Sequence, residues 1–407
     1  MNIKIYRISK IHNLLFFGIQ IICVAALIIA CNSAPNNSTI SSSPNQECIQ
    51  NTNLNTNYFP KRANINYATR FSVEYQNNYK IVTVNNPYPD ANTSFKYVLV
   101  QCGTPAPKGF KQDQVITVPV NTVASLSTTH LPHLAKLGLV DKLVGVRNLK
   151  IVNTPEVVDK IKADKIAELG NNNVNVERLL ELAPDLVTTY GTGNPQTDSY
   201  PKLLEAGLKV AINAEYMEST PLGRSEWLKF TALFFNKEEK AEKVFGTISK
   251  NYQEFAAKTK AIKKRPKVFT GFNFKGTWYI PGCKSYPAQY LADAGAELIC
   301  IGNSSGSVPS SFENIFERAA TADYWINVNQ SWQNLKDIVK EDSRYSDFQA
   351  MQKGNVYNNN ARLNENGGND YWEGGISNPD LILADLIKIF HPELLPNHQL
   401  FFYQKLN

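Results

Sequence analysis

The sequence has few of the residues that build metal centres. Of its five histidines, one lies near the start, and the others are His130, His133, His391 and His398. A zinc or manganese site needs several histidine and carboxylate ligands that converge on one point. His130 and His133 are three residues apart and could share a metal, but this spacing also fits two ordinary helix histidines. The sequence therefore disfavours a bare-metal site.

An excess of one charge sign is also lacking. Lys and Arg number 42 against 36 Asp and Glu, and three of the basic residues, Lys4, Arg7 and Lys10, lie in the first thirty residues, where no acidic residue occurs. The remainder has 39 basic against 36 acidic residues. Nucleic-acid binding usually needs a clear basic surplus, so we expect no nucleic-acid partner.

Catalytic motifs are missing as well. No phosphate-binding Walker loop, paired-carboxylate motif or cysteine cluster occurs. Ser127 and His130 are the best candidates for a nucleophile and its base, but Ser125 and Thr129 stand where a Gly-x-Ser-x-Gly elbow needs glycines. We therefore expect neither enzymatic activity nor a cofactor.

The long apolar run, 14–30, is short for a membrane span and follows a basic start. It ends in Leu27-Ile28-Ile29-Ala30-Cys31, which resembles a bacterial lipoprotein signal. The resemblance implies that residues 1–30 are removed and that Cys31 is lipidated. Residues 31–57, rich in Asn, Ser, Thr and Pro, then predict a flexible tether. The alternative is a plain signal peptide or membrane anchor with an incidental cysteine.

Export would expose four further cysteines to an oxidising compartment. Four cysteines allow three pairings. Proximity along the chain favours Cys48 with Cys102 and Cys283 with Cys300, although free buried thiols remain an alternative.

The first half of the main body changes texture near residue 115. Residues 58–115 predict a β-rich extension, because 71–75, 79–84 and 95–100 read as strands between turn residues. Residues 116–235 alternate short apolar strands with amphipathic helices. Repeated βαβ units of this kind predict a parallel sheet covered by helices.

One long helix is expected in the middle, at 236–265. Asn236 reads as its N-cap with Glu239 three residues on, and apolar residues recur at helical spacing to Ile262. About 28 residues would span roughly 42 Å. Two shorter helices meeting near Gly246 are the alternative.

The second half, 266–407, repeats the α/β pattern of the first. Here 267–272 predicts a strand, 278–282 a loop, 286–294 and 312–319 helices, and Asn378-Pro379 opens the last helix. The expected fold class is α/β, with two parallel-sheet βαβ lobes joined by one long rigid helix and a β-rich N-terminal extension.

These features together resemble the class III, or long-helix, substrate-binding proteins of ABC importers for ferric siderophores, haem and cobalamin. The most specific pieces are 137–146, 176–187, 207–210 after a helix, and the long helix itself. The resemblance covers about Val118 to Leu395. It implies a ligand cleft between two lobes that move little, and a membrane-anchored lipoprotein outside the cytoplasm, in the periplasm. The extension lies outside the family pattern.

Ligand contacts are then expected in loops that follow strands. Such loops offer aromatic rings, hydroxyl donors and two guanidinium groups, which suit a bulky, partly anionic metal chelate. A ferric siderophore is the first choice, cobalamin or haem the alternative, and zinc or manganese less favoured. The candidate residues, each of which could instead be a turn or core residue, are Thr128, Thr129, His130, Tyr190, Tyr216, Arg224, Trp278, Tyr279, Tyr286, Arg362 and Trp372.

The resemblance also implies a second partner, the ABC permease in the cytoplasmic (inner) membrane. Family members present one acidic residue per lobe to basic permease residues, and the matching positions are Glu177 and Glu313. Each carboxylate could instead serve only its helix dipole. We expect the protein to be a monomer.

Overall fold

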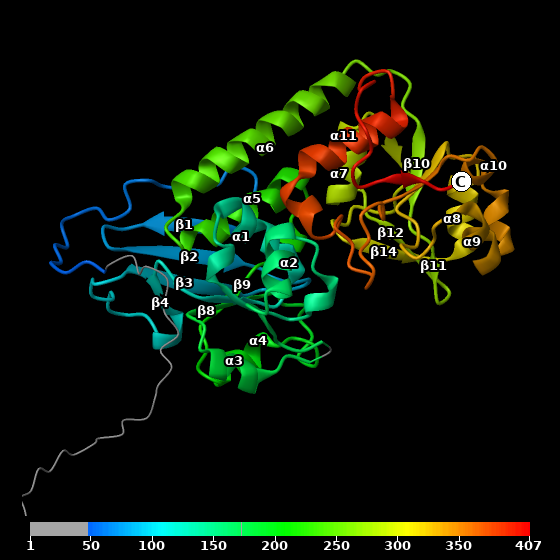
Figure 1. The fold of residues 1–407 in the computed structure, drawn as a ribbon. Helices are drawn as coiled ribbons and strands as arrows, with labels where there is room; N and C mark the ends of the chain where they lie inside the picture. The colour runs from blue at the N-terminus through cyan, green and yellow to red at the C-terminus, as the bar shows by residue number, and fades with distance from the viewer. Residues whose placement is uncertain (1–47, 172) are drawn as a thin grey trace, which may run out of the picture. The chain divides into compact units, whose positions relative to one another are not determined.

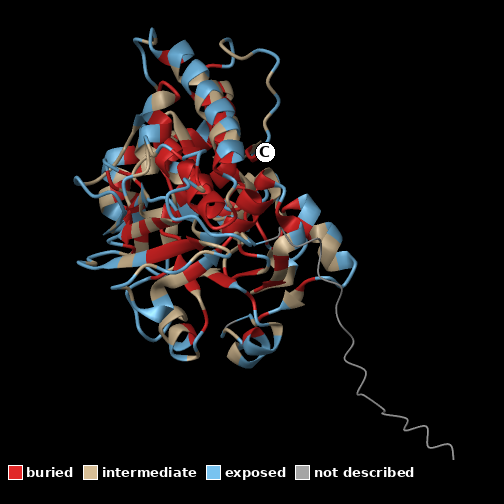
Figure 2. Cartoon of the chain, turned by 90° about the vertical axis from the view of Figure 1, so that its left-hand side faces the viewer, coloured by how far each residue is buried: buried red, intermediate tan, exposed pale blue. Residues whose placement is uncertain are grey.

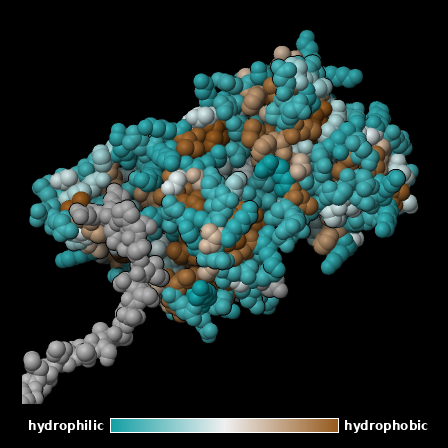
Figure 3. Space-filling model, in the orientation of Figure 1, coloured by the Kyte–Doolittle hydropathy of each residue, from teal (hydrophilic) through white to brown (hydrophobic). Residues whose placement is uncertain are grey.

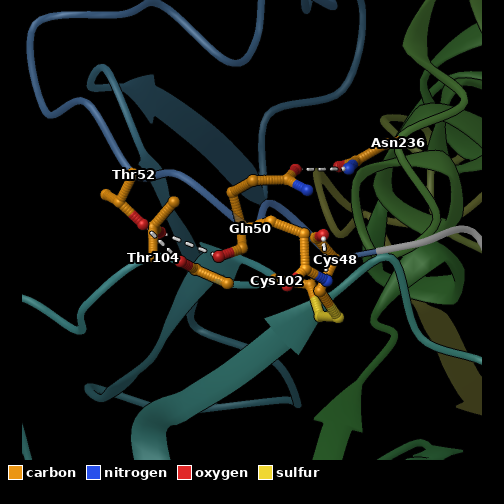
Figure 4. The surroundings of a disulfide bond; sticks show 8 residues. Cys48, Gln50, Thr52, Cys102, Thr104 and Asn236 are labelled. Atoms are coloured by element: carbon orange, nitrogen blue, oxygen red, sulfur yellow. Dashed lines mark hydrogen bonds between the residues drawn. A yellow bond between two sulfur atoms is a disulfide. The ribbon is translucent and has the colours of Figure 1, made fainter.

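The computed structural model describes residues 48–171 and 173–407 (Figure 1). The predicted signal peptide and the lipidation residue Cys31 lie outside these residues. The predicted tether extends into them, and its last part is bound to the body. Cys48 forms a disulfide with Cys102, and the Ile49 amide donates to the Cys102 carbonyl at 3.0 Å. Figure 4 shows this disulfide with Thr52 and Thr104 beside it. The tether boundary therefore moves from 57 back to Cys48.

The extension forms the expected sheet. Strands β1 (Phe71–Tyr75), β2 (Tyr79–Asn85) and β3 (Ser94–Gln101) pair antiparallel in sequence order. Strand β4 (Val115–Val118) joins β3 in parallel. The sequence pattern places that segment in the following lobe, because it precedes a βαβ pattern. Its pairing places the end of the extension at about Val118 instead of 115.

The N-terminal lobe is built on a fully parallel sheet of order β7-β6-β5-β8-β9. Its strands are β5 (Val123–Ser125), β6 (Leu143–Val146), β7 (Ala167–Glu168), β8 (Leu186–Thr189) and β9 (Val210–Ile212). The helices are α1 (Leu131–Leu137), α2 (Pro155–Lys162), α3 (Val176–Leu182), α4 (Tyr200–Glu205) and α5 (Pro221–Leu233). Parallel strands place all their carboxyl ends at one edge, so the loops that follow them meet there.

Helix α5 is buried along almost its whole length. Within it, Glu226 has no exposed surface and pairs with Lys229 at 3.0 Å. The Glu226 carboxylate also accepts hydrogen bonds from the backbone amides of Asn66, Tyr67 and Ala68 at 2.6 to 3.1 Å. A buried carboxylate needs such partners to offset its lost hydration. These bonds attach the extension to α5.

A second buried charge joins the extension to the start of the long helix. Lys80 of β2 is fully buried and bonds Glu238 at 2.7 Å and the Leu233 carbonyl at 2.6 Å. Burial lowers the pKa of Lys80, and Glu238 works in the opposite direction. The same ammonium group bonds the side chain of Asn236 at 2.8 Å.

Helix α6 (Glu238–Thr259) follows without interruption at Gly246, and it packs on α5 and on α11 (Pro379–Phe390) (Figure 1). It is shorter than the predicted 236–265. Asn236 has a φ of 52°, so it lies before the helix and Lys237 is the N-cap. At the other end, the buried Thr259 hydroxyl donates to the Asp293 carbonyl at 2.6 Å, and the helix stops there.

The C-terminal lobe has a sheet of order β13-β10-β15-β16-β17, parallel except for the last pair. The strands are β10 (Lys267–Thr270), β13 (Glu297–Leu298), β15 (Tyr324–Ile326), β16 (Val356–Asn358) and β17 (Gln404–Lys405). Its other helices are α7 (Tyr286–Asp293), α8 (Phe312–Ala319), α9 (Leu335–Glu341) and α10 (Gln349–Gln352). The second expected disulfide, Cys283–Cys300, is present, with Cα atoms 5.2 Å apart.

A small antiparallel sheet in this lobe replaces the loop predicted at 278–282. Strand β12 (Thr277–Pro281) pairs with β11 (Asn273–Phe274) and with β14 (Ser307–Ser310). Alternation along β12 buries Trp278 completely and leaves Tyr279 52% exposed. The strand signal was hidden because Pro281 and Gly282 read as turn residues.

Figure 2 shows the buried residues gathered among the sheets and inner helices, with stripes of exposed residues along the long helix. The face seen in Figure 3 is mostly hydrophilic and carries its hydrophobic residues in separate patches. No helix within 48–171 or 173–407 is long and apolar enough to cross a membrane.

The Glu226 contacts generate a stability prediction. Glu226→Ala should lower the free energy of unfolding by about 3 kcal/mol or more. The change removes the buried acceptor that Lys229 and three backbone amides share. Denaturant unfolding followed by circular dichroism measures this. Glu254→Ala is the control, since Glu254 faces Lys250 at 3.9 Å on the exposed side of α6 and should cost less than about 0.5 kcal/mol. Equal losses in the two variants would contradict the prediction.

Candidate ligand-binding site

Three loops at the carboxyl ends of β5, β8 and β9 surround a hollow of about 230 Å³ in the N-terminal lobe. Polar and aromatic side chains line it, which is the usual lining of a small-molecule site. The lining residues are Ser127, Thr129, Tyr190, Thr192, Glu215 and Tyr216. Glu215 is the one acidic or basic residue among these lining residues.

Side-chain hydrogen bonds fix the shape of these loops. The Tyr216 hydroxyl donates to the Gly191 carbonyl at 2.6 Å, which joins the second loop to the third. The Asp198 carboxylate accepts from the amides of Thr192 and Gly193 at 2.7 and 3.0 Å. The Ser127 and Thr129 hydroxyls lie 2.9 Å apart. The hollow is therefore held open before any ligand arrives.

A second pocket lies between the lobes around Arg224 of α5. Its guanidinium carbon lies 4.2 Å from the ring centre of Tyr286, which belongs to α7 of the other lobe. The volume is about 10 Å³, room for about one water molecule. The lining residues are Pro221, Arg224, Tyr286, Tyr290, Tyr371, Trp372, Gly375, Ile376 and Ile382.

Charge links the two pockets, because Glu215 and Arg224 interact electrostatically. Burial raises the pKa of Glu215, and Arg224 opposes that shift. Burial works to lower the pKa of Arg224, but Tyr286 and Glu215 outweigh it, so the pKa of Arg224 rises. Arg224 therefore stays charged.

Arg224 also has a donor to offer. Its Nε is buried and makes no hydrogen bond to the described residues, and the same holds for Oε2 of Glu215. A buried donor without a partner costs free energy that a ligand acceptor would recover.

Three tyrosines of the site, Tyr216, Tyr290 and Tyr371, are neutral phenols. Burial raises the pKa of Tyr216, with Glu215 adding to the effect, and burial likewise raises the pKa of Tyr290 and Tyr371. Each therefore presents a hydroxyl donor and an aromatic face, and not a phenolate.

Most of the predicted ligand residues fall around these pockets. Thr129, Tyr190 and Tyr216 line the hollow, and Thr128 lies in the same turn. Arg224, Tyr286 and Trp372 line the pocket between the lobes. The ligand-binding role of all these residues stays a prediction.

His130 does not belong to the site. Its ring is 3% exposed and lies beneath the turn, with Nδ1 3.1 Å from the Thr188 hydroxyl. Burial lowers the pKa of His130 to about 3, and burial acts in the same way on His133. Both rings are neutral core groups. No cluster of three or more His, Cys, Asp or Glu suited to a metal lies in the described part of the chain.

Three residues predicted in the second lobe also differ. Trp278 is a core residue that donates to the Thr270 carbonyl at 2.9 Å. Tyr279 is exposed on β12 and lines neither pocket. Arg362 is already bound, to Asp370 at 2.6 Å and over the ring of Phe401 at 4.3 Å. A position after a strand does not reveal such internal partners.

The sequence did not single out Tyr290 or Tyr88, whereas Glu215 and Tyr371 lie in loops where ligand contacts were expected. Glu215 lies three residues after the end of β9, in the loop that follows this strand. Tyr290 and Tyr371 face the cleft only through the packing of their elements. Tyr88 belongs to the extension, and its ring lies against Gly191 and Gly193.

The predicted docking residues occupy matching positions. Glu177 is the second residue of α3, after the N-cap Asn175, and Glu313 is the second residue of α8, after the N-cap Ser311. Both are exposed. Glu313 lies 3.5 Å from Arg344, whose closer partner is Asp342 at 2.7 Å.

Two α/β lobes joined in sequence by one long helix, with a polar hollow at the strand ends of the first lobe, define a class of ligand-capturing proteins. The chain belongs to the periplasmic binding protein family, whose model matches residues 123–363. This confirms the resemblance found in the sequence. The family consists of substrate-binding transport proteins.

Relatives support this placement. An uncharacterized lipoprotein of Methanocaldococcus jannaschii is 27% identical over 97% of this chain and 97% of its own length. An uncharacterized ABC transporter substrate-binding lipoprotein of Bacillus subtilis is 26% identical over 38% of this chain and 46% of its own. A periplasmic heme-binding protein of Pseudomonas aeruginosa shares the fold, with a TM-score of 0.52 at 17% identity, covering 71% of this chain and 98% of that one.

Hydrogen bonds join the two lobes directly, beside the pocket that lies between them. Glu373 of the C-terminal lobe is 1% exposed and accepts from the amides of Asn153 and Thr154 at 3.0 and 2.6 Å and from the Thr154 hydroxyl. Burial raises the pKa of Glu373 to about 7, although these bonds oppose the shift and Asp370 adds to it.

This shift generates a pH prediction. The folded state holds a proton on Glu373 that the unfolded chain releases at its usual carboxyl pKa. Its contribution to stability is therefore full below about pH 4.5 and lost as the pH rises through about 7. Relative to Glu373→Gln, the native protein should lose about 1 to 3 kcal/mol of unfolding free energy between pH 5 and pH 8, measured by denaturant titration at both values.

The control for this experiment is Glu365→Gln, a change at an exposed carboxyl in the same loop. It should follow the pH dependence of the native protein. If the Glu373→Gln and native curves run parallel, Glu373 does not titrate with a raised pKa.

Proposed function

We propose that this protein is the extracytoplasmic, membrane-anchored binding lipoprotein of an ABC importer, and that it captures a ferric siderophore between its lobes and delivers it to the permease. The family supports binding and transport, and two of the relatives are lipoproteins. The choice of ligand rests on the site itself.

The observation that carries the ligand proposal is Arg224. It is a permanently charged group between the lobes whose Nε lacks a partner among the described residues, and burial raises the pKa of its acidic neighbour Glu215. An anionic oxygen of a metal chelate would satisfy both the charge and the free donor. The surrounding tyrosine hydroxyls would add neutral hydrogen bonds to the same oxygens.

Size and surface also bear on the ligand. A hollow of about 230 Å³ lies below the range of about 300 to 1,000 Å³ for sites that enclose a drug-sized ligand. It would therefore hold one side of a chelate and leave the rest outside the hollow. The faces of Tyr286 and Trp372 would equally suit a flat macrocycle, so haem and cobalamin remain the alternative ligands by the same mechanism.

The test is a tryptophan-fluorescence titration with ferric hydroxamates, ferric catecholates, ferric citrate, haemin and cobalamin. Trp372 is 44% exposed and lines the pocket, so its emission should respond. Arg224→Ala should weaken binding of an anionic ferric complex by about 1 to 3 kcal/mol. Arg362→Ala, the matched arginine control, should change it by less than about threefold because Arg362 is held by Asp370.

Two outcomes would overturn the ligand proposal. Binding of haemin or cobalamin with no response to any ferric chelate would replace the siderophore by that ligand. Equal losses from the Arg224 and Arg362 variants would remove Arg224 as the specific anchor.

Delivery is proposed to use Glu177 and Glu313, the exposed carboxylates at the starts of α3 and α8. Reversing both to Lys should abolish import and weaken association with the permease, since like charges would then face its basic residues. Ligand affinity should stay within about threefold, because neither residue lines a pocket. Pull-down of the permease and uptake of the labelled ferric chelate measure the two effects.

The control makes the same change of charge elsewhere. Glu239 and Glu254 are exposed on α6, and replacing both by Lys should preserve permease association. If this control pair weakens association as much as the Glu177 and Glu313 pair, overall charge and not docking is responsible.

A further inference from the structure

The extension lies outside the segment that matches the family, 123–363, yet it touches the candidate site at several points. Tyr88 sits in the turn between β2 and β3, and its ring lies against the glycines of the loop that follows β8. A Cβ on Gly191 would meet the ring at 2.9 Å, and one on Gly193 at 2.8 Å. Both distances are too short, so the ring and the loop are packed directly against each other.

The neighbouring residue of the same turn is also engaged. The Tyr216 hydroxyl donates to the Gly191 carbonyl and lies 3.3 Å from the carbonyl of Pro87. Tyr216 and Tyr190 line the 230 Å³ hollow. One turn of the extension thus contacts two of the three loops that form it.

Contacts behind the hollow continue this pattern. Glu218, 2% exposed, directly follows the third loop and accepts from the amides of Thr69 and Arg70 at 2.9 Å. Glu226, on the same helix as Arg224, accepts from the amides of 66–68. The loop after β9 and helix α5 are therefore hydrogen-bonded to the extension, and the loop after β8 packs against its Tyr88 ring.

We infer that the N-terminal extension is a structural part of the ligand site, and that Tyr88 is the positioning residue that sets the loop Tyr190–Gly193. The inference deepens the proposed function and rests on it for the identity of the site. Tyr88 acts through the loop, since it does not itself line the hollow. Tyr88 also forms a side-chain hydrogen bond with Tyr200. Burial, together with this bond, raises the pKa of Tyr200 to about 12.

The first test needs no ligand. Hydrogen exchange of the Thr192 and Gly193 amides, now bonded to Asp198, reports whether the loop is held. Tyr88→Ala should speed exchange across 190–198 by about tenfold or more. Tyr88→Phe should leave it near the native rate, because the ring atoms and not the hydroxyl touch the glycines.

Tyr58→Ala is the matched control. Tyr58 is an extension tyrosine that bonds Asn53 and Asn77 near the opposite end of the β2 strand. It should leave exchange in 190–198 unchanged. Native rates in Tyr88→Ala, or equal acceleration in Tyr58→Ala, would overturn the inference.

The second test uses binding. Gly191→Ala should weaken binding of the ferric chelate that responds in the titration by about tenfold, because its Cβ pushes on Tyr88. In the double variant Gly191→Ala/Tyr88→Ala, the added Cβ no longer meets a tyrosine ring. This variant should therefore bind no worse than Tyr88→Ala alone. Additive losses, or native affinity in Tyr88→Ala, would overturn the inference.

The two failures are distinguishable. A native protein that binds no chelate, haemin or cobalamin contradicts the proposed function, whatever the exchange rates are. A native protein that binds while Tyr88→Ala neither loosens the loop nor weakens binding contradicts only the role of the extension.

Discussion

The position of the extension depends on a carboxylate buried in helix α5. Glu226 has no access to water, so its charge must be balanced by Lys229 and by the backbone amides of 66–68. That requirement fixes the start of the extension against α5. The sheet β1-β2-β3 then follows in a set register, and its far turn brings Tyr88 to the Tyr190–Gly193 loop. The buried charge of Glu226 thus helps to position Tyr88 beside the loop that lines the hollow.

Helix α5 also explains why the two lobes share one site. Its first turns carry Arg224 to the aromatic rings of the second lobe, and its middle carries Trp227 and Phe230 into the core. Its last residues adjoin Lys80, which bonds Glu238 at the start of α6. The element that anchors the extension is therefore the one that presents the charged ligand group and leads to the long helix.

The elements that could be predicted from the sequence were those with strong local patterns. Period-two alternation gave β1, β2 and β3 nearly to the residue, and apolar spacing with an Asn or Ser cap gave α3 and α8. The helix predicted at 286–294 corresponds to α7, whose C-cap is Ala294. Proximity along the chain was enough for both disulfide pairs, whose members are 54 and 17 residues apart.

The errors came from tertiary contacts that no local pattern records. The end of α6 is set by the bond of Thr259 to Asp293, 34 residues away, while the lysine-rich stretch beyond it reads as helix. Strand β4 looks like the start of a βαβ unit and instead pairs with β3. For the site, a loop position could not distinguish the buried His130 and Trp278 from the accessible Tyr286. Arg362 and Arg224 look alike in sequence, and only the Asp370 contact separates them.

Arg224 and Glu373 together constrain how binding can occur. The lobes are joined by α6 and also by Glu373, whose carboxylate binds the 153–154 backbone of the other lobe. Asn364 adds bonds to the Lys150 and Val152 carbonyls, and the backbone of Gly368 lies close to Ile151. Any large separation of the lobes would have to break these bonds, of which the one between Glu373 and the Thr154 amide is buried. Affinity must therefore come from groups already in position, and a preorganised site avoids the entropy of ordering them on binding. The hydrogen bonds of Tyr216, Asp198 and the extension supply that order in the lobe that holds the hollow.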